Sequence, residues 1–194
     1  FPTRRSSDLQ AGNHLRYQEL ARQYPDTMQI YGVPVKRREW MGVLHLKGFL
    51  FDNTLLYSGA SLNNIYLHQQ ERYRYDRYHL LQNRDLADSM QHLVQHGLVA
   101  SKAVHRLDLP NLPTTRSLRN DIGDLRSRLK HATYDTTAGQ AGIGGLSVSP
   151  LLGVGKNNPL SRVICELIAC SQQQLTICTP YFNLPLPVTR ELNR

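Results

Sequence analysis

Two β-rich runs separated by a two-residue turn signal are the feature that most constrains the fold of this 194-residue chain. Residues 43–51 and 54–57 are apolar and rich in strand-forming side chains, and Asp52-Asn53 stands between them. Runs joined in this way favour an antiparallel β-hairpin. Aromatic and charged side chains alternate over residues 72–82, which predicts a further strand.

Helical patterns flank these strands. Residues 117–133 are amphipathic, with apolar side chains spaced by four, three and four residues at Leu118, Ile122, Leu125 and Leu129. Further helices are expected over residues 14–24, 85–96 (with Gly97 as the stop) and 159–169. A buried strand at 175–179 and a helix that begins near 188 complete the pattern. Strands alternating with helices predict an α/β domain, with a mixed β-sheet flanked by helices.

The ends of the chain and its Gly-rich stretch suggest how it is divided. Residues 1–9 show no periodicity and resemble translated vector sequence, so we expect a non-native tail there. Residues 10–135 are expected to form a first domain, incomplete at its N-terminus, and residues 136–145 a flexible linker. Residues 146–194 are expected to begin a second, truncated domain, because a strand and a helix start usually open a βα unit.

Charge and cysteine content narrow the function classes. The chain carries 23 Lys and Arg against 15 Asp and Glu, a net charge of +8, which favours partners that bear phosphates. No run approaches the roughly 18–20 apolar residues that cross a bilayer. The three cysteines form no C-x-x-C pair, so we expect free, buried thiols and a reducing, cytoplasmic compartment. His68 and His79 have no partner at metal-ligand spacing, so we assign them a structural role, and no metal or other cofactor is expected.

The segment that carries chemistry begins at His45. On a strand, His45 and Lys47 project from one face, and Leu44, Leu46 and Leu50 from the other. An imidazole and an ammonium side by side favour a bound anion, and a neutral imidazole can attack phosphorus while lysine stabilises the charged oxygens. Ser61 and Asn63 follow the second strand of the hairpin, which brings them back toward the same phosphate.

Four blocks carry a resemblance to a known family. They are residues 31–34 (Tyr-Gly-Val-Pro), 43–63 with the pattern H-x-K-x-x-x-x-D at 45–52, 73–79 and 175–183. In this order they resemble the phospholipase D superfamily and, within it, the bacterial phosphatidylserine synthases, over roughly residues 28–194. The resemblance implies a phospholipase D-like domain, the first of two pseudo-symmetric halves. It also implies transfer of a phosphatidyl group from CDP-diacylglycerol to L-serine, with release of CMP, through a phosphohistidine intermediate.

The resemblance assigns roles to individual residues. It makes His45 the nucleophile, Lys47 the phosphate clamp and Asp52 an orienting or structural acid, although Asp-Asn is also ordinary turn chemistry. It gives Asn63 and, less directly, Ser61 to the phosphate oxygens. No other histidine is followed two residues later by lysine. We therefore expect the second catalytic histidine beyond Arg194, and an inactive chain unless two copies pair their motifs in an oligomer.

Residues 66–84 combine tyrosines with arginines. One interpretation is an interfacial strip that contacts lipid headgroups or the pyrophosphate of a nucleotide lipid, through Tyr73, Arg74, Tyr75 and Arg77. The other is a half-exposed strand with cross-strand Tyr–Arg packing. The basic residues of 117–133 could lie on an anionic membrane, but a solvated face of a soluble helix is the favoured interpretation. The expected location is the cytoplasmic side of the inner membrane, on an anionic surface.

Two other functions stay open. One is a different phosphodiester-cleaving member of the superfamily, such as a nuclease or phospholipase. The other is a non-catalytic module that binds anionic lipid or nucleic acid. The Tyr-Gly-Val-Pro and Tyr-Arg-Tyr-Asp-Arg-Tyr blocks favour the synthase, so CDP-diacylglycerol and L-serine are the expected substrates and no specific nucleic acid is expected.

Overall fold

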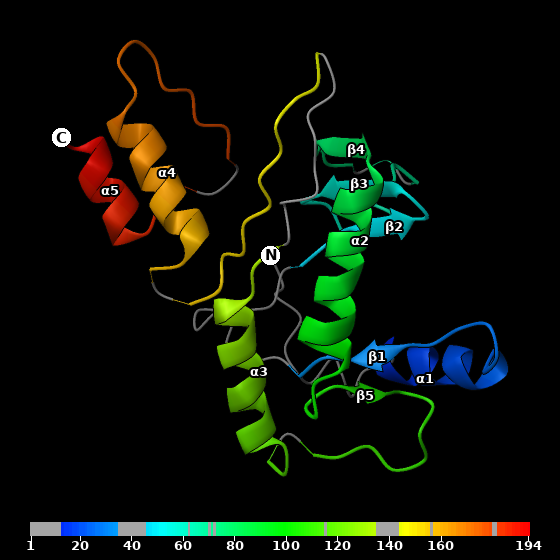
Figure 1. Cartoon of the computed structure of the whole chain (residues 1–194). Helices are drawn as coiled ribbons and strands as arrows, with labels where there is room; N and C mark the ends of the chain where they lie inside the picture. Colours follow the sequence, from blue (N-terminus) through cyan, green and yellow to red (C-terminus); the bar gives the residue numbers. More distant parts are fainter. Residues whose placement is uncertain are drawn as a thin grey trace.

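The computed structural model describes residues 13–34, 46–61, 63–69, 71, 73–114, 116–134, 144–155, 157–179 and 182–194. Figure 1 shows its helices and strands. The helices are α1 (Asn13–Gln23), α2 (Arg84–His92), the π-helix η3 (Leu93–Val99), α3 (Arg119–His131), α4 (Pro159–Ala169) and α5 (Leu186–Leu192). The strands are β1 (Tyr31–Gly32), β2 (Phe49–Phe51), β3 (Thr54–Ser58), β4 (Tyr78–Gln82) and β5 (His105–Arg106).

The predicted hairpin is present and forms part of a three-stranded antiparallel sheet in the order β2-β3-β4. Phe49 pairs with Leu56, and Phe51 pairs with Thr54 across the Asp52-Asn53 turn. The structure differs from the prediction in length. Strand β2 begins at Phe49, because residues 46–48 are irregular, and β4 begins at Tyr78, because residues 73–77 are irregular.

A second, two-stranded sheet pairs β1 with β5. The two strands approach closely at Gly32, where a Cβ would lie 2.8 Å from the Cδ2 atom of Leu107. Leu107 is itself buried. Any other residue at this position would therefore force the buried Leu107 side chain to shift.

The hydrophobic core lies between η3 and α3. Its buried residues are Leu98, Ala103, Val104, Leu125 and Leu129. The predicted amphipathic helix is confirmed, because Leu125 and Leu129 face this core and Ile122 packs against it. Leu46 also packs against it, so the segment that leads into β2 is anchored at the core.

The prediction that Gly97 ends a helix is wrong. The helical path widens into η3 and continues to Val99. At Gly97, a Cβ would meet Leu93 at 3.4 Å and Leu129 at 4.0 Å. The glycine therefore serves close packing of η3 on α3, and tertiary contact overrides its tendency to end a helix.

Helices α4 and α5 contact each other and form a pair in Figure 1. Helix α4 has the predicted bounds, but none of its residues is buried. Residues 175–179 form no strand, which corrects the prediction, and Leu175 and Ile177 are exposed. The cysteines are free, as expected, but Cys165 is only half-buried and Cys170 and Cys178 are exposed. The residues that flank the three cysteines in the sequence are largely apolar, but no described helix or strand buries the cysteine side chains completely.

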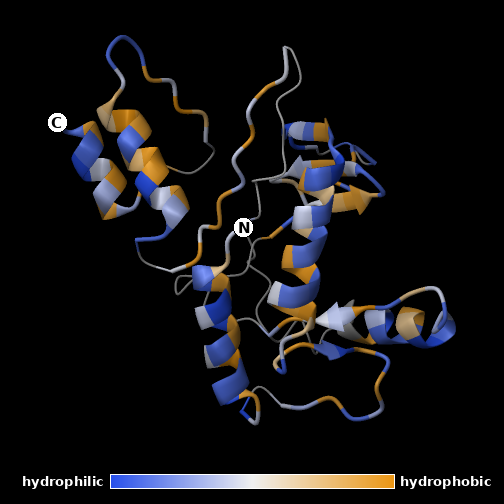
Figure 2. Cartoon of the chain, viewed as in Figure 1, coloured by the Kyte–Doolittle hydropathy of each residue, from blue (hydrophilic) through white to orange (hydrophobic). Residues whose placement is uncertain are grey.

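The α/β class is confirmed, and every strand pair in the described ranges is antiparallel. Hydrophobic residues run the whole length of β2, whereas α2 and α4 carry hydrophilic and hydrophobic residues together (Figure 2). Among the described residues, no helix is long and apolar enough to span a membrane. Residues 1–9 and most of the predicted linker lie outside the described residues, so the division into domains stays a prediction.

Candidate active site

The hairpin decides which candidate residues share one end of the sheet. Because β2 and β3 are antiparallel, Ser58 at the end of β3 returns toward the residues that precede Phe49. Lys47 lies in that preceding segment and is half-buried, and Gly48 lies against β3, where its Cβ would meet the carbonyl oxygen of Leu56 at 3.5 Å. The structure thus places Lys47 at the same end of the hairpin as the turn that leads to Ser61.

Asp52 lies at the opposite end of the hairpin. It is exposed and has a φ of 51°, a left-handed conformation that aspartate tolerates in turns. This geometry suits the turn role of Asp52. His45 lies outside the described residues, so its role as the nucleophile, and that of Asp52 as its orienting acid, stay predictions.

The turn after β3 is held by its own side chains. The Ser58 hydroxyl is buried and accepts a hydrogen bond from the Ala60 amide at 3.0 Å. The Asn63 side-chain oxygen accepts hydrogen bonds from the amides of Ile65 at 3.1 Å and Tyr66 at 3.2 Å. Because the oxygen of Asn63 is used in this way, its side-chain NH₂ group is the part suited to a phosphate oxygen. Ser61 and Asn63 are both exposed, as a phosphate site requires.

The Tyr-Arg segment folds back on this turn. The Arg74 amide donates to the Ile65 carbonyl at 3.2 Å. The Asp76 carboxylate lies beside Gly59, where a Cβ would meet its oxygens at 3.4 and 3.6 Å. Asp76 belongs to the 73–79 block of the family resemblance, which assigns it no role. In the sequence, its position between Tyr75 and Arg77 is the feature that could have indicated one. The structure shows that it lies against the turn that carries the candidate phosphate ligands.

Tyrosines of this segment form an exposed aromatic cluster. The Tyr75 hydroxyl donates to the Tyr73 hydroxyl at 3.2 Å, and the two rings meet edge to face at 5.1 Å. The hydrogen bond to Tyr73 raises the pKa of the Tyr75 phenol above its usual value. Tyr75 is 89% exposed. The cross-strand packing interpretation does not apply at Tyr73 and Tyr75, because both precede β4.

An apolar pocket of about 180 Å³ opens beside the same turn. Its walls come from β2, β3, the turn and the start of β4. Sequence reasoning missed it, since its residues meet only through strand pairing. The lining residues are Phe49, Phe51, Leu56, Ala60, Ser61, Leu67 and Tyr78.

The chain is similar to known proteins over most of its length. It is 46% identical over 177 residues to the CDP-diacylglycerol–serine O-phosphatidyltransferase of Escherichia coli K12, which covers 91% of this chain and 39% of that protein. It is 47% identical over 162 residues to the corresponding Haemophilus influenzae protein, which covers 82% of this chain and 36% of the relative. No family model matches the chain.

A solved structure agrees with these relatives. The crystal structure of phosphatidylserine synthase from Haemophilus influenzae Rd KW20 superposes with a TM-score of 0.84 at 44% identity, covering 95% of this chain and 42% of that one. The chain is a homologue of the bacterial phosphatidylserine synthases. It spans about two fifths of the length of the synthases that it matches.

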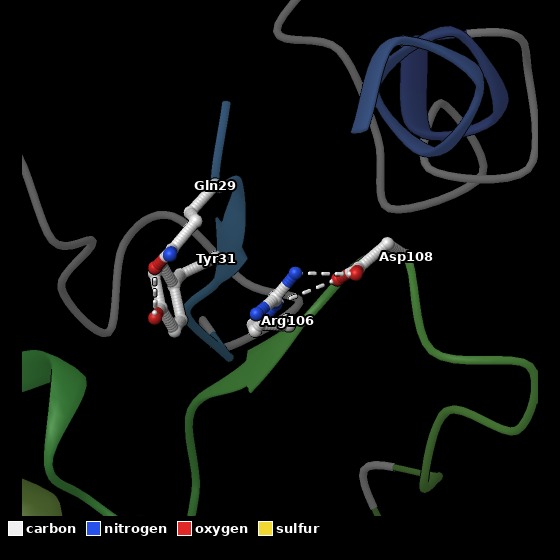
Figure 3. Close-up of polar contacts among 4 residues, drawn as sticks. All are labelled: Gln29, Tyr31, Arg106 and Asp108. Atoms are coloured by element: carbon white, nitrogen blue, oxygen red, sulfur yellow. Dashed lines mark hydrogen bonds and ion pairs between the residues drawn. The ribbon is translucent and has the colours of Figure 1, made fainter. Parts of the chain in front are cut away.

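In this synthase homologue, the Tyr-Gly-Val-Pro block forms β1 and pairs with β5, which places Tyr31 opposite Arg106. Figure 3 shows the polar contacts around this pair. The Arg106 guanidinium donates two hydrogen bonds to Asp108, at 3.0 and 2.6 Å. The Arg106 hydrogen bond is the main reason that the pKa of the Asp108 carboxyl lies below its usual value. Tyr31 and Val33 of the block pack against the hydrophobic core, so the block contributes to the fold.

No metal site emerges from the described part of the synthase homologue. Within those ranges, no group of three or more His, Cys, Asp or Glu side chains is arranged to hold a metal ion. His68 stacks on Tyr73 at 4.2 Å between ring centroids, and His79 lies near Tyr57 at 6.5 Å. These two histidines therefore pack against aromatic neighbours.

Proposed function

We propose that this chain forms part of an enzyme that transfers the phosphatidyl group of CDP-diacylglycerol to L-serine, giving phosphatidylserine and CMP. The observation that carries the proposal is the TM-score of 0.84 at 44% identity to a phosphatidylserine synthase. The arrangement of Lys47, Ser61 and Asn63 around one end of the hairpin supports it, because an ammonium, a hydroxyl and an amide NH₂ group can each donate a hydrogen bond to a phosphate oxygen.

In the proposed reaction, an imidazole nitrogen of His45 attacks the phosphorus, and the bond to the CMP oxygen breaks. A general acid protonates the departing CMP. The serine hydroxyl then attacks the same phosphorus, its proton passes to the conjugate base of that acid, and the P–N bond to His45 breaks. In the resemblance this acid is the histidine of a second H-x-K motif, and no second H-x-K occurs in these 194 residues.

The test uses a chimera in which this chain replaces the aligned segment of the Haemophilus influenzae relative. We expect serine-dependent release of CMP from CDP-diacylglycerol, and we expect His45→Ala to lower its rate by at least about 10³-fold, as the loss of a nucleophile does. His131→Ala is the matched control, because His131 is exposed and contacts the Ser127 carbonyl of its own helix at 2.8 Å. Full activity in His45→Ala, or a rate of CMP release that does not depend on serine, would refute the proposal.

We further propose that the Tyr-Arg segment meets an anionic membrane surface on the cytoplasmic side. Exposed Tyr73 and Tyr75 beside Arg77 combine amphipathic rings with a cation, a combination suited to a lipid headgroup layer. Arg77→Ala should weaken binding of the chain to phosphatidylglycerol vesicles about fivefold in a sedimentation assay. Arg128→Ala removes an equally exposed charge from α3 and should have no such effect. Equal losses in both variants would show non-specific charge attraction.

A further inference from the structure

The apolar pocket of about 180 Å³ lies on the face of the sheet opposite buried Leu55. Phe49 and Phe51 point to this face from β2, and their rings are nearly parallel, with centroids 6.3 Å apart. Leu56 joins them as the cross-strand partner of Phe49. Ala60 and Ser61 close the pocket on the side of the phosphate-binding turn.

We propose that this pocket holds part of one acyl chain of the phospholipid whose phosphate is bound by Lys47, Ser61 and Asn63. The inference rests on the proposed function and deepens it, because it assigns residues to the hydrocarbon part of the lipid.

The position and chemistry of the pocket point to this occupant. Ser61 belongs both to its wall and to the turn that carries Asn63, so a single ligand can reach from the phosphate site into the pocket. A ligand that does so needs a phosphate at one end and an apolar segment at the other. A polar sugar or base would lose its hydrogen bonds to water without gaining others among these apolar walls.

The volume and exposure of the pocket agree with binding of one segment of an acyl chain. Its volume is below the roughly 300–1,000 Å³ of pockets that enclose a whole small ligand, so it takes one segment of a longer molecule. Phe51 is 58% exposed at its edge, and Leu67 is 45% exposed. Apolar side chains left open around a hollow in this way are typical of a surface that binds an apolar ligand.

Two basic residues stand next to pocket-lining residues in the sequence. Lys47 lies two residues before Phe49, and Arg77 directly precedes Tyr78, which lines the pocket. Cationic residues, which suit the phosphate of a phospholipid, thus lie within a few residues of apolar ones, which suit its first carbon atoms. This charge pattern distinguishes a phospholipid chain from an uncharged apolar ligand.

The test measures how binding depends on chain length. The 194-residue chain is titrated with dibutyryl and dihexanoyl CDP-diacylglycerol in the absence of serine. We expect the dihexanoyl lipid to bind about tenfold more tightly, since two further methylene groups are buried. Phe51→Ala should reduce that ratio to about threefold.

Leu80→Ala is the matched control. Leu80 pairs with Leu56 on the same face of the sheet and is 72% exposed, but it does not line the pocket. It should keep the tenfold ratio. A second variant, Ala60→Leu, fills the pocket from within and should bring the ratio close to one. A wild-type ratio near one, or equal losses in Phe51→Ala and Leu80→Ala, overturns the inference.

This test separates the two proposals, because binding is measured without transfer. Serine-dependent CMP release by the chimera, together with a chain-length ratio near one, would refute the pocket and leave the proposed function standing. A tenfold ratio that depends on Phe51, together with no transfer, would support the pocket as an acyl-chain site and refute the transferase.

Discussion

At the residue scale, the Arg106–Asp108 pair shows how one ion pair links stability to pH. The Asp108 side chain is only 18% exposed and accepts two hydrogen bonds from one guanidinium. These bonds stabilise the ionised carboxylate, so its pKa is lower in the folded chain than in the unfolded chain. The stabilisation is therefore present above the unfolded pKa of about 3.9 and is lost as the pH falls through the lower folded value.

We expect Asp108→Asn to lower the urea midpoint of the chain at pH 7. The midpoints of the variant and the wild type should converge as the pH falls below about 4, because the wild-type carboxyl then becomes neutral as well. Asp88→Asn is the control, since Asp88 and Arg84 are exposed and 3.7 Å apart. A difference for Asp108→Asn that is as large at pH 3 as at pH 7 would contradict this account.

At the element scale, helix α4 begins where the sequence predicts because its start is capped. The Asn158 side chain accepts a hydrogen bond from the Ser161 amide at 2.8 Å and donates one to the Gly155 carbonyl at 2.7 Å. Pro159 follows at the first helical position, where its missing N–H has no helical partner. Hydrogen bonds between residues close in the sequence thus define this helix start.

Asn158→Ala should lower the free energy of unfolding by about 1 kcal/mol, measured by urea denaturation followed at 222 nm. Asn158→Asp keeps the cap on Ser161 but cannot donate to Gly155, so it should recover only part of that loss. An alanine variant as stable as the wild type would mean that the cap contributes nothing.

At the scale of the whole molecule, burial is uneven. Leu125 in the core is 2% exposed, whereas Leu167 on α4 is 64% exposed and Leu186 on α5 is 62% exposed. The apolar side of α4 therefore adds little to the stability of this chain by itself. The core between η3 and α3 gathers five of the buried hydrophobic residues in the described part of the chain into one cluster.

This contrast predicts unequal costs for the same substitution. Leu125→Ala should destabilise the chain by about 2–5 kcal/mol, because it removes a buried side chain and leaves a cavity. Leu167→Ala should cost less than about 0.5 kcal/mol. Urea unfolding of both variants measures the difference. Similar costs would show that the outer side of α4 is buried in solution.

The sequence by itself determined the features that depend on neighbouring residues. The hairpin follows from two β-rich runs around Asp52-Asn53, α3 from its leucine spacing, and the family from four short blocks. Each of these signals lies within one continuous segment. The residues of the candidate phosphate site were found in the same way, because Lys47, Ser61 and Asn63 lie on one hairpin and its turn.

Only the tertiary structure decided what depends on distant segments. Residues 175–179 form no strand, because strand propensity needs a neighbouring strand to complete its hydrogen bonds. Gly97 sits inside a helix, because α3 packs against it. The Asp76 carboxylate meets Gly59, and the pocket forms from three strands and a turn, through pairing that no single segment encodes. Burial and cavities are sums over segments far apart in the chain, so local patterns cannot fix them.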